Sequence, residues 1–191
     1  MIRVPNVFIG TMFTGEGDYD DACLAISNQQ NVKIHHVVIK NLPEKEAHNA
    51  LWSAWREAKN DFDMFVKVDA DTILSHQNVI FELWTMMFKN TRITGIQAPL
   101  YDHFTDGEIN GLNCFSPKVT FRDTADSLFC DRNVDVDHDI VIKASDVPLS
   151  LKPAGIHCSK AHHLQAFHFG VHRMLKNQHG IIAREIGRAH V

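Results

Sequence analysis

Two carboxylates separated by one residue, Asp69 and Asp71, follow directly after the largely apolar run FVKV at residues 65–68. The run predicts a buried strand, and ligands of open α/β sheets bind beyond the carboxyl ends of such strands. If the backbone stays extended there, side-chain alternation turns both carboxylates to the same side. Two oxygen ligands about 6–7 Å apart, from about 3.3 Å per residue, can then share one hard divalent cation or its waters. The pair therefore predicts a cation site that also receives substrate phosphates.

A D-x-D triplet alone is not specific, because others occur at residues 18–20, 61–63, 135–137 and 137–139. The first begins a predicted helix and the second lies in a loop before the strand, where capping and loop solvation explain acidic residues. The last two overlap in the stretch NVDVDHDIVIK. An EF-hand is excluded there, because Ile140 stands at the position that requires glycine.

The elements around the acidic pair predict an α/β fold. Apolar periodicity indicates strands and helices in alternation along the first half of the chain. This order implies a mainly parallel, doubly wound sheet flanked by helices, with a small mixed C-terminal part. The expected strands are 7–13, 32–40, 64–68 and 94–100, with short ones near 112–115 and 140–143, and the expected helices are 18–28, 43–58, 76–90 and 164–176.

Composition sets the broad class. The chain has 191 residues, 45% of them hydrophobic and 22% charged, as expected for a single soluble globular domain. A net charge of −4 argues against nonspecific binding of nucleic acid. Four scattered cysteines without a C-x-x-C motif indicate reduced thiols and a cytoplasmic location. No apolar stretch approaches the roughly 20 residues of a membrane span, which leaves a peripheral membrane role open.

The last seven residues, EIGRAHV at 185–191, have an unusual back-translation. They can be written GAG ATC GGA AGA GCA CAC GTC, which matches a common sequencing-library adapter read in frame. We therefore expect residues 185–191 to be a non-native tail of a reading frame assembled from metagenomic reads, and the natural protein to continue beyond it.

Three stretches of the chain together resemble GT-A-fold glycosyltransferases of the family 2 type. They are VFIGTMF at 7–13, EAHNALWSAWREA at 46–58 and FVKVDADTIL at 65–74. The resemblance covers about residues 5 to 180. It implies one catalytic domain over residues 1–184, with a nucleotide-binding half to about residue 100 and an acceptor and metal half after it. The implied reaction is an inverting, hexosyltransferase-type transfer from a nucleotide-diphosphate sugar, with a UDP-sugar favoured, to a glycan, lipid or protein acceptor that the sequence does not identify.

The resemblance also implies roles for particular side chains. Asp71 would bind Mn²⁺ or Mg²⁺, Asp69 would hold the ribose or a metal-bound water, and His157 would complete the metal shell. Asp137, with Asp139 beside it, aligns with the catalytic carboxylate of the family. An inverting transfer needs such a base to take the proton of the acceptor hydroxyl.

The remaining residues implied by the resemblance concern the nucleotide. The family's acidic D-D-G-S-like turn after the second strand is missing, so that Asn41 or Glu44 would have to read the base. Candidates for the rest of the nucleotide site are Thr11, Phe13 and Glu16 after the first strand, Asn49 in the first long helix, and Gln165, Arg173 and Lys176 near the diphosphate.

Several alternatives stay open. One is a noncatalytic nucleotide-sugar-binding domain. A D-x-D phosphatase would need a later G-D-x-x-x-D, and a nucleotidyltransferase would need a glycine-rich first loop, and neither is found. Thirteen histidines make zinc worth considering, but the candidate ligands lack the usual spaced pairs. Those candidates are His157, Cys158, His162 and His163, or His168 and His172.

Overall fold

The computed structural model describes residues 3–125, 127, 130, 140–142, 146–147, 153–171, 173–175 and 177. The predicted β-α-β-α-β-α-β elements are present up to residue 102, with ends within a few residues of those expected, and a short strand at residues 72–74 is added before the third helix. Residues 163–171, 173–175 and 177 are helical, as predicted for the last helix. The elements are β1 (Asn6–Phe13), α1 (Tyr19–Ser27), β2 (Lys33–Lys40), α2 (Glu44–Ala58), η1 (Lys59–Asp61), β3 (Met64–Lys67), β4 (Thr72–Leu74), α3 (Val79–Lys89), β5 (Ile93–Asp102), β6 (Gly107–Phe115), β7 (Ile140–Ile142) and β8 (Gly155–His157).

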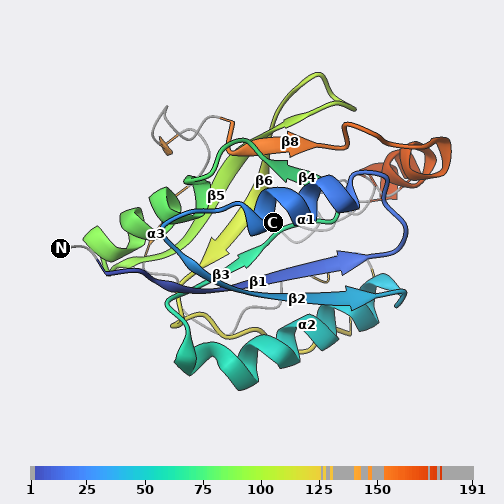
Figure 1. Ribbon diagram of the computed structural model, residues 1–191. Helices are drawn as coiled ribbons and strands as arrows, with labels where there is room; N and C mark the ends of the chain where they lie inside the picture. The colour runs from blue at the N-terminus through green and yellow to red at the C-terminus, as the bar shows by residue number, and fades with distance from the viewer. Residues whose placement is uncertain are drawn as a thin grey trace, which may run out of the picture.

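Within the described residues the strands form one eight-stranded sheet in the order β2-β1-β3-β6-β5-β8-β4, with β7 paired to β5 (Figure 1). β2, β1 and β3 form the parallel arrangement expected from the sequence, and β5 pairs in parallel with β7 and β8. β6 runs antiparallel to both of its neighbours, β3 and β5, and β4 runs antiparallel to β8. The sheet is therefore mixed, which corrects the prediction of a mainly parallel sheet.

A tight hairpin is the reason for this difference. β5 and β6 pair from Asp102 and Gly107 onward, so the chain reverses directly instead of crossing over through a helix. The reversed strand then inserts beside β3 and runs antiparallel to it. Its sequence, GEINGLNCF, contains two glycines and several polar residues, and only its last part was recognised as a strand.

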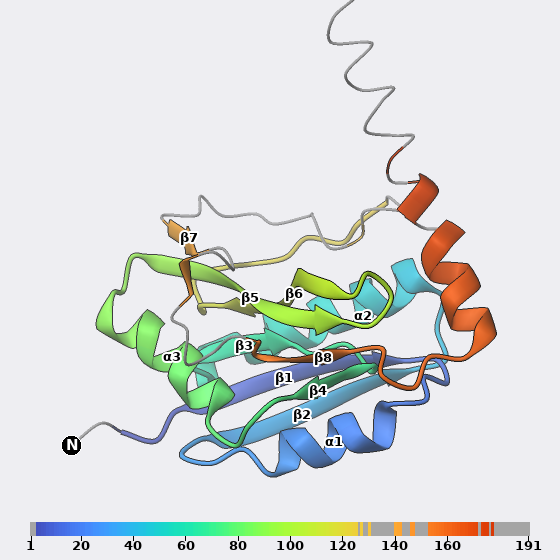
Figure 2. The ribbon, with the colours of Figure 1, turned by 90° about the horizontal axis from the view of Figure 1, so that it is seen from above.

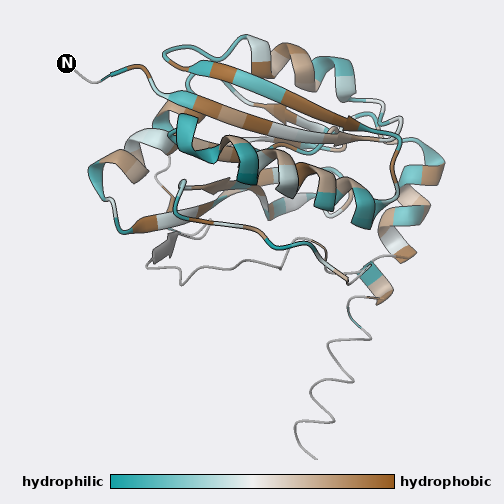
Figure 3. Ribbon diagram, turned by 90° about the horizontal axis from the view of Figure 1, so that it is seen from below, coloured by the Kyte–Doolittle hydropathy of each residue, from teal (hydrophilic) through white to brown (hydrophobic). Residues whose placement is uncertain are grey.

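Helices cover both faces of the sheet. α1 and α3 pack on one face and α2 packs on the other, as Figures 1 and 2 show. Along β1 the two faces alternate, because Ile9 joins the core beneath α1 and α3 whereas Phe8 joins the aromatic core beneath α2. In Figure 3 the strands between the helices carry brown, hydrophobic positions with some teal, hydrophilic positions among them. α2 approaches β1 so closely that a Cβ added at Gly10 would lie 2.4 Å from Leu51 Cδ1.

The C-terminal helical residues lie at the end of the molecule to which β1 and β2 point (Figure 1). The predicted apolar stripe is present but exposed, with Leu164 75% and Phe167 71% accessible. Val171, Met174 and Leu175 are exposed as well. The stripe therefore does not extend the core. In the part of the chain that the structure describes, no helix has the length and apolar character to cross a membrane.

Candidate functional site

A pocket opens where the parallel strands β1 and β3 end side by side. Its volume of about 520 Å³ is within the range typical of ligand sites. The loop after β1, the first turns of α2, the turn after β3 and the end of β8 all contribute to it. The lining includes Met12, Thr14, Glu16, Glu44, His48, Lys67, Asp69, Asp71, His157 and His168.

The acidic pair reaches this pocket by a turn. β3 ends at Lys67, and the backbone N–H of Thr72 donates to the Asp69 carbonyl oxygen at 2.9 Å. The backbone is therefore not extended between Asp69 and Asp71, which corrects the geometric premise of the sequence-based prediction. The turn then leads into β4, which pairs with β8 so that Thr72 lies opposite His157.

Asp69 is paired with a lysine that the sequence analysis did not single out. Lys67 Nζ lies 2.5 Å from Asp69 Oδ1, and the lysine side chain is 12% exposed. Burial raises the pKa of Asp69, but its side chain keeps 39% of its surface accessible and the Lys67 ammonium decides the direction, so the pKa is lowered. Lys67 precedes Asp69 by two residues, and that spacing on a strand was a signal that could have revealed the pair.

The pKa of Asp71, in contrast to that of Asp69, is raised. Its Oδ2 accepts hydrogen bonds from Gln165 Nε2 at 2.7 Å and from the Cys158 thiol at 3.0 Å. Its Oδ1 lies 3.4 Å from His157 Nε2. Burial raises the pKa of Asp71, and Asp69 raises it further, so that His157 and the hydrogen bonds only partly offset the cost of the charge. A cation at Oδ1 would relieve that cost.

His157 is oriented by Asp102, a residue missed from the sequence. Their strands pair in parallel with Asp102 opposite His157, and His157 Nδ1 lies 2.8 Å from Asp102 Oδ1. Burial raises the pKa of the fully buried Asp102, but hydrogen bonds from Thr105 and His157 outweigh it and lower the pKa. An ionised carboxylate only accepts, so Nδ1 is inferred to donate and Nε2 faces Asp71. Metal-ligating histidines are commonly held in this way.

These side chains fit a divalent cation. One ligand atom each of Asp71, His157 and Cys158 lies within 4.8 Å of the others. Burial and the nearby Asp71 raise the pKa of the Cys158 thiol, which stays protonated and donates to Asp71. The atoms that could bind a cation are thus Asp71 Oδ1 and His157 Nε2, a set that would suit Mn²⁺ better than Mg²⁺. Cys158 has a φ of 58°, a conformation that is costly for a side-chain-bearing residue and that clusters at functional sites.

Of the nucleoside residues predicted after the first strand, only Glu16, in the loop after β1, lines the pocket, whereas Thr11 and Phe13 lie on the α1 face of β1. Glu16 lines the pocket, and its carboxylate accepts from the backbone N–H and hydroxyl of Thr14, each at 2.8 Å. Thr11 is buried and bonds to His36, and Phe13 stacks on Tyr19 with ring centroids 4.0 Å apart. By alternation the strand presents Met12 to the pocket and turns its odd-numbered neighbours to the α1 face.

The other predicted residues are placed as follows. Asn41 is exposed with a φ of 56° just after β2. Asn49 exchanges hydrogen bonds with the backbone of Thr124, at 2.8 and 3.1 Å, and so ties α2 to a distant segment. The Arg173 guanidinium lies over the Phe169 ring at 5.8 Å. Asp137, Asp139, His172 and Lys176 lie outside the described residues.

No protein-family model matches the sequence, and no curated protein matches it in a sequence search. Among solved structures, the chain is similar to a glycosyltransferase involved in glycosylation of the major capsid of PBCV-1, with 10% identity and a TM-score of 0.45 over 86% of this chain and 98% of that one. It is also similar to A197 from STIV, with 9% identity and a TM-score of 0.41, over 60% of this chain and 65% of that one.

Proposed function

We propose that the protein is a metal-dependent glycosyltransferase that uses a nucleotide-diphosphate sugar as its donor. The observation that carries this proposal is the convergence of Asp69, Asp71 and His157 on one pocket at the carboxyl ends of β1 and β3. Ligands of α/β sheets bind at this edge, and the pocket combines carboxylates with an imidazole held by a buried acid.

Asp71 and His157 would hold Mn²⁺. Mg²⁺ would be held through Asp71, because an imidazole nitrogen is a less natural ligand for it. The cation, when bound, supplies positive charge for the diphosphate that leaves when the sugar is transferred. Gln165 supports this arrangement from the C-terminal helix, because its amide holds Asp71 Oδ2 and leaves Oδ1 for the cation. Asp102 keeps the imidazole turned so that Nε2 faces the same point.

Asp69 would act on the donor's ribose. Lys67 occupies its Oδ1, and the other oxygen is available to accept from a hydroxyl group of the nucleoside. The lowered pKa keeps this carboxylate ionised at neutral pH. Asp137 remains our candidate for the base that takes the acceptor proton, with Asp139 as its neighbour, and inversion follows from that single-displacement role.

Hydrolysis of UDP-sugars with and without Mn²⁺ tests the proposal. Asp71→Asn should lower Mn²⁺-dependent turnover by at least about 100-fold, since a direct ligand matters more than the outer-shell partners whose loss costs about 10–100-fold. Asp61→Asn is the matched control, because Asp61 is an exposed member of another D-x-D triplet and should leave turnover unchanged. Binding of the nucleotide sugar without turnover by the unmodified protein would favour the noncatalytic binding domain instead.

A further inference from the structure

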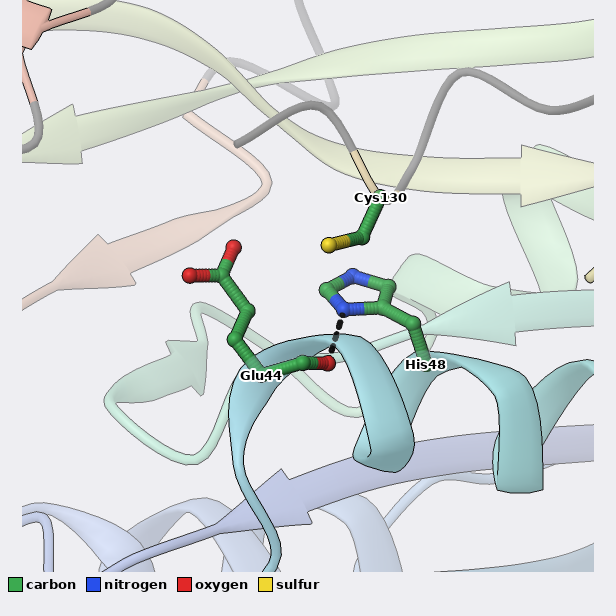
Figure 4. A group of neighbouring side chains, drawn as sticks. All are labelled: Glu44, His48 and Cys130. Atoms are coloured by element: carbon green, nitrogen blue, oxygen red, sulfur yellow. Dashed lines mark hydrogen bonds between the residues drawn. The ribbon is translucent and has the colours of Figure 1, made fainter. Parts of the chain in front are cut away.

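A second group of metal-ligand side chains meets at the start of α2, on another wall of the same pocket. Glu44 begins the helix, His48 follows one turn later, and Cys130 comes from a segment far along the chain. One ligand atom from each of the three lies within 4.8 Å of the other two. Figure 4 shows the Cys130 sulfur beside the His48 ring, with the Glu44 carboxylate further out on the same side of the ring as the sulfur.

His48 is the residue whose state calls for a ligand. It is 4% exposed, and its Nδ1 lies 2.8 Å from the Glu44 backbone carbonyl oxygen, the bond dashed in Figure 4. A carbonyl only accepts, so Nδ1 carries the proton and Nε2 presents a lone pair. Among the described residues Nε2 has no hydrogen-bond partner. A buried nitrogen of this kind normally has one.

Electrostatics keeps this lone pair available. Burial lowers the pKa of His48, and the Lys67 ammonium lowers it further, against smaller opposing effects of Glu44 and Asp69. The imidazole is therefore neutral at neutral pH, which is the form that binds metals. A backbone carbonyl on Nδ1 is also a common way in which proteins orient a metal-binding histidine.

The other two side chains are well placed for the same ion. Cys130 is 1% exposed, and its carbonyl oxygen accepts from Trp52 Nε1 at 3.4 Å, so its segment is anchored to α2 one turn beyond His48. Glu44 is exposed and lines the pocket. Its carboxylate can therefore approach a bound ion from the solvent side.

The geometry points to a binding site for Zn²⁺, or a transition metal of similar softness, formed by Glu44 Oε, His48 Nε2 and Cys130 Sγ. Oxygen, nitrogen and sulfur ligands around one ion are typical of zinc, with bond lengths of about 2.0–2.3 Å. A contraction of the present cluster would bring all three atoms to such distances. Thiolate ligation distinguishes this site from the harder site at Asp71 and His157.

Charge balance favours the occupied state. Binding replaces the thiol proton of Cys130, which is released to solvent, while His48 stays neutral and Glu44 stays ionised. One divalent cation with one thiolate and one carboxylate carries no net charge, as a largely buried site requires. Because Glu44 and His48 both line the pocket, the fourth coordination position faces it, in the arrangement of zinc sites that keep one position open.

Cobalt provides the spectroscopic test, because Co²⁺ takes zinc sites and shows a thiolate-to-metal charge-transfer band. Full-length protein freed of metal by a chelator should develop this band at one equivalent of Co²⁺ and lose it when Zn²⁺ is added. Cys130→Ser and His48→Gln should abolish the band. Cys23→Ser and Cys158→Ser should retain it, the first as a matched cysteine in α1 and the second as the thiol of the Asp71 site.

Two results would overturn the proposal. One is absence of the band in the unmodified protein, and the other is a band that survives Cys130→Ser and disappears in Cys158→Ser. Should Cys130→Ser or His48→Gln fail to fold, X-ray absorption of Zn²⁺-loaded Cys158→Ser decides the question. One sulfur ligand at about 2.3 Å supports the site, and coordination by oxygen and nitrogen alone contradicts it. Neither readout depends on glycosyltransferase activity, so the two proposals fail separately.

Discussion

At the scale of single residues, the site contains two aspartates whose pKa values are shifted in opposite directions. Asp69 is compensated by Lys67 at 2.5 Å, and its pKa is lowered. Asp71 has a raised pKa because burial and Asp69 act together. The D-x-D motif predicts that both carboxylates matter but does not distinguish them. The difference arises from the turn between Asp69 and Thr72. It places Asp71 against His157 and Gln165 of the C-terminal helix, whereas Asp69 stays beside Lys67.

This difference predicts a stability effect of Asp71→Asn. For a carboxylate whose folded pKa is raised, the ionised form disfavours the fold, and stability falls as pH rises from the unfolded pKa through the folded one. The uncharged amide removes that cost, so in a chelator at neutral pH the variant should unfold at a higher temperature than the unmodified protein, with about 2–4 °C for each kcal/mol gained in a domain of this size.

Thermal unfolding over a series of pH values checks the sign. The advantage of the variant should disappear at about pH 3, below the unfolded pKa, where Asp71 is protonated in both states. Adding Mn²⁺ should raise the melting temperature of the unmodified protein and leave the variant unchanged. A variant less stable than the unmodified protein at neutral pH would contradict the electrostatic account of Asp71.

The contact between Asp102 and His157 predicts that Asp102 affects the affinity for the metal by positioning the imidazole. Asp102→Asn removes the charge that holds His157 Nδ1 and should weaken Mn²⁺ binding by about 10–100-fold, as other outer-shell changes do. Mn²⁺ titration by calorimetry measures this directly. Asp106→Asn is the control, because Asp106 lies in the same β5–β6 turn and its carboxylate accepts an exposed hydrogen bond from the Tyr101 hydroxyl. Equal affinities in the two variants would remove Asp102 from the site.

At the scale of elements, the sequence predicts the helices and strands that can be recognised from the pattern of their own residues. The apolar stripe of α2 and the β-branched run of β2 need no distant partner to be recognised, and both are present with nearly the expected bounds. β4 and β8, of three residues each, have no such signal, and they become strands only through pairing, β4 with β8 and β8 also with β5. His48 was likewise missed as a site residue. The apolar stripe predicts that Ala47, the residue before His48, is buried. His48 lies outside the stripe but is buried as well, because the buried face of α2 is wider than the stripe.

The contact between α2 and β1 positions the first turn of α2 at the pocket, and it predicts the effect of Gly10→Ala. The added Cβ would lie 2.4 Å from Leu51 Cδ1, so the buried leucine or the helix must shift. We expect a loss of about 1–3 kcal/mol, the usual cost of overpacking. Denaturant unfolding measures the loss. Gly170→Ala, at a helical position where an added Cβ has open space, should instead stabilise by up to about 1 kcal/mol.

At the scale of the whole molecule, two apolar cores lie on the two faces of one sheet, and the C-terminal helix belongs to neither. It lies instead at the strand ends, where Gln165 reaches Asp71. The sequence predicted this helix and its apolar stripe from periodicity. It could not predict that the stripe faces outward, because periodicity shows that a helix has an apolar side without showing what that side contacts.

Because the apolar stripe of the C-terminal helix faces outward, its residues should contribute little to the free energy of unfolding. Leu164→Gln and Phe167→Gln remove apolar surface that is already 75% and 71% exposed, so each should change the free energy of unfolding by less than about 0.5 kcal/mol. Leu51→Ala, which removes a fully buried side chain of similar size from the α2 core, should cost about 2–5 kcal/mol. Urea unfolding of the three variants compares them directly. A loss of several kcal/mol from either glutamine variant would mean that the stripe packs against part of this molecule, in addition to the contacts of Gln165 with Asp71 and of Phe169 with Phe104.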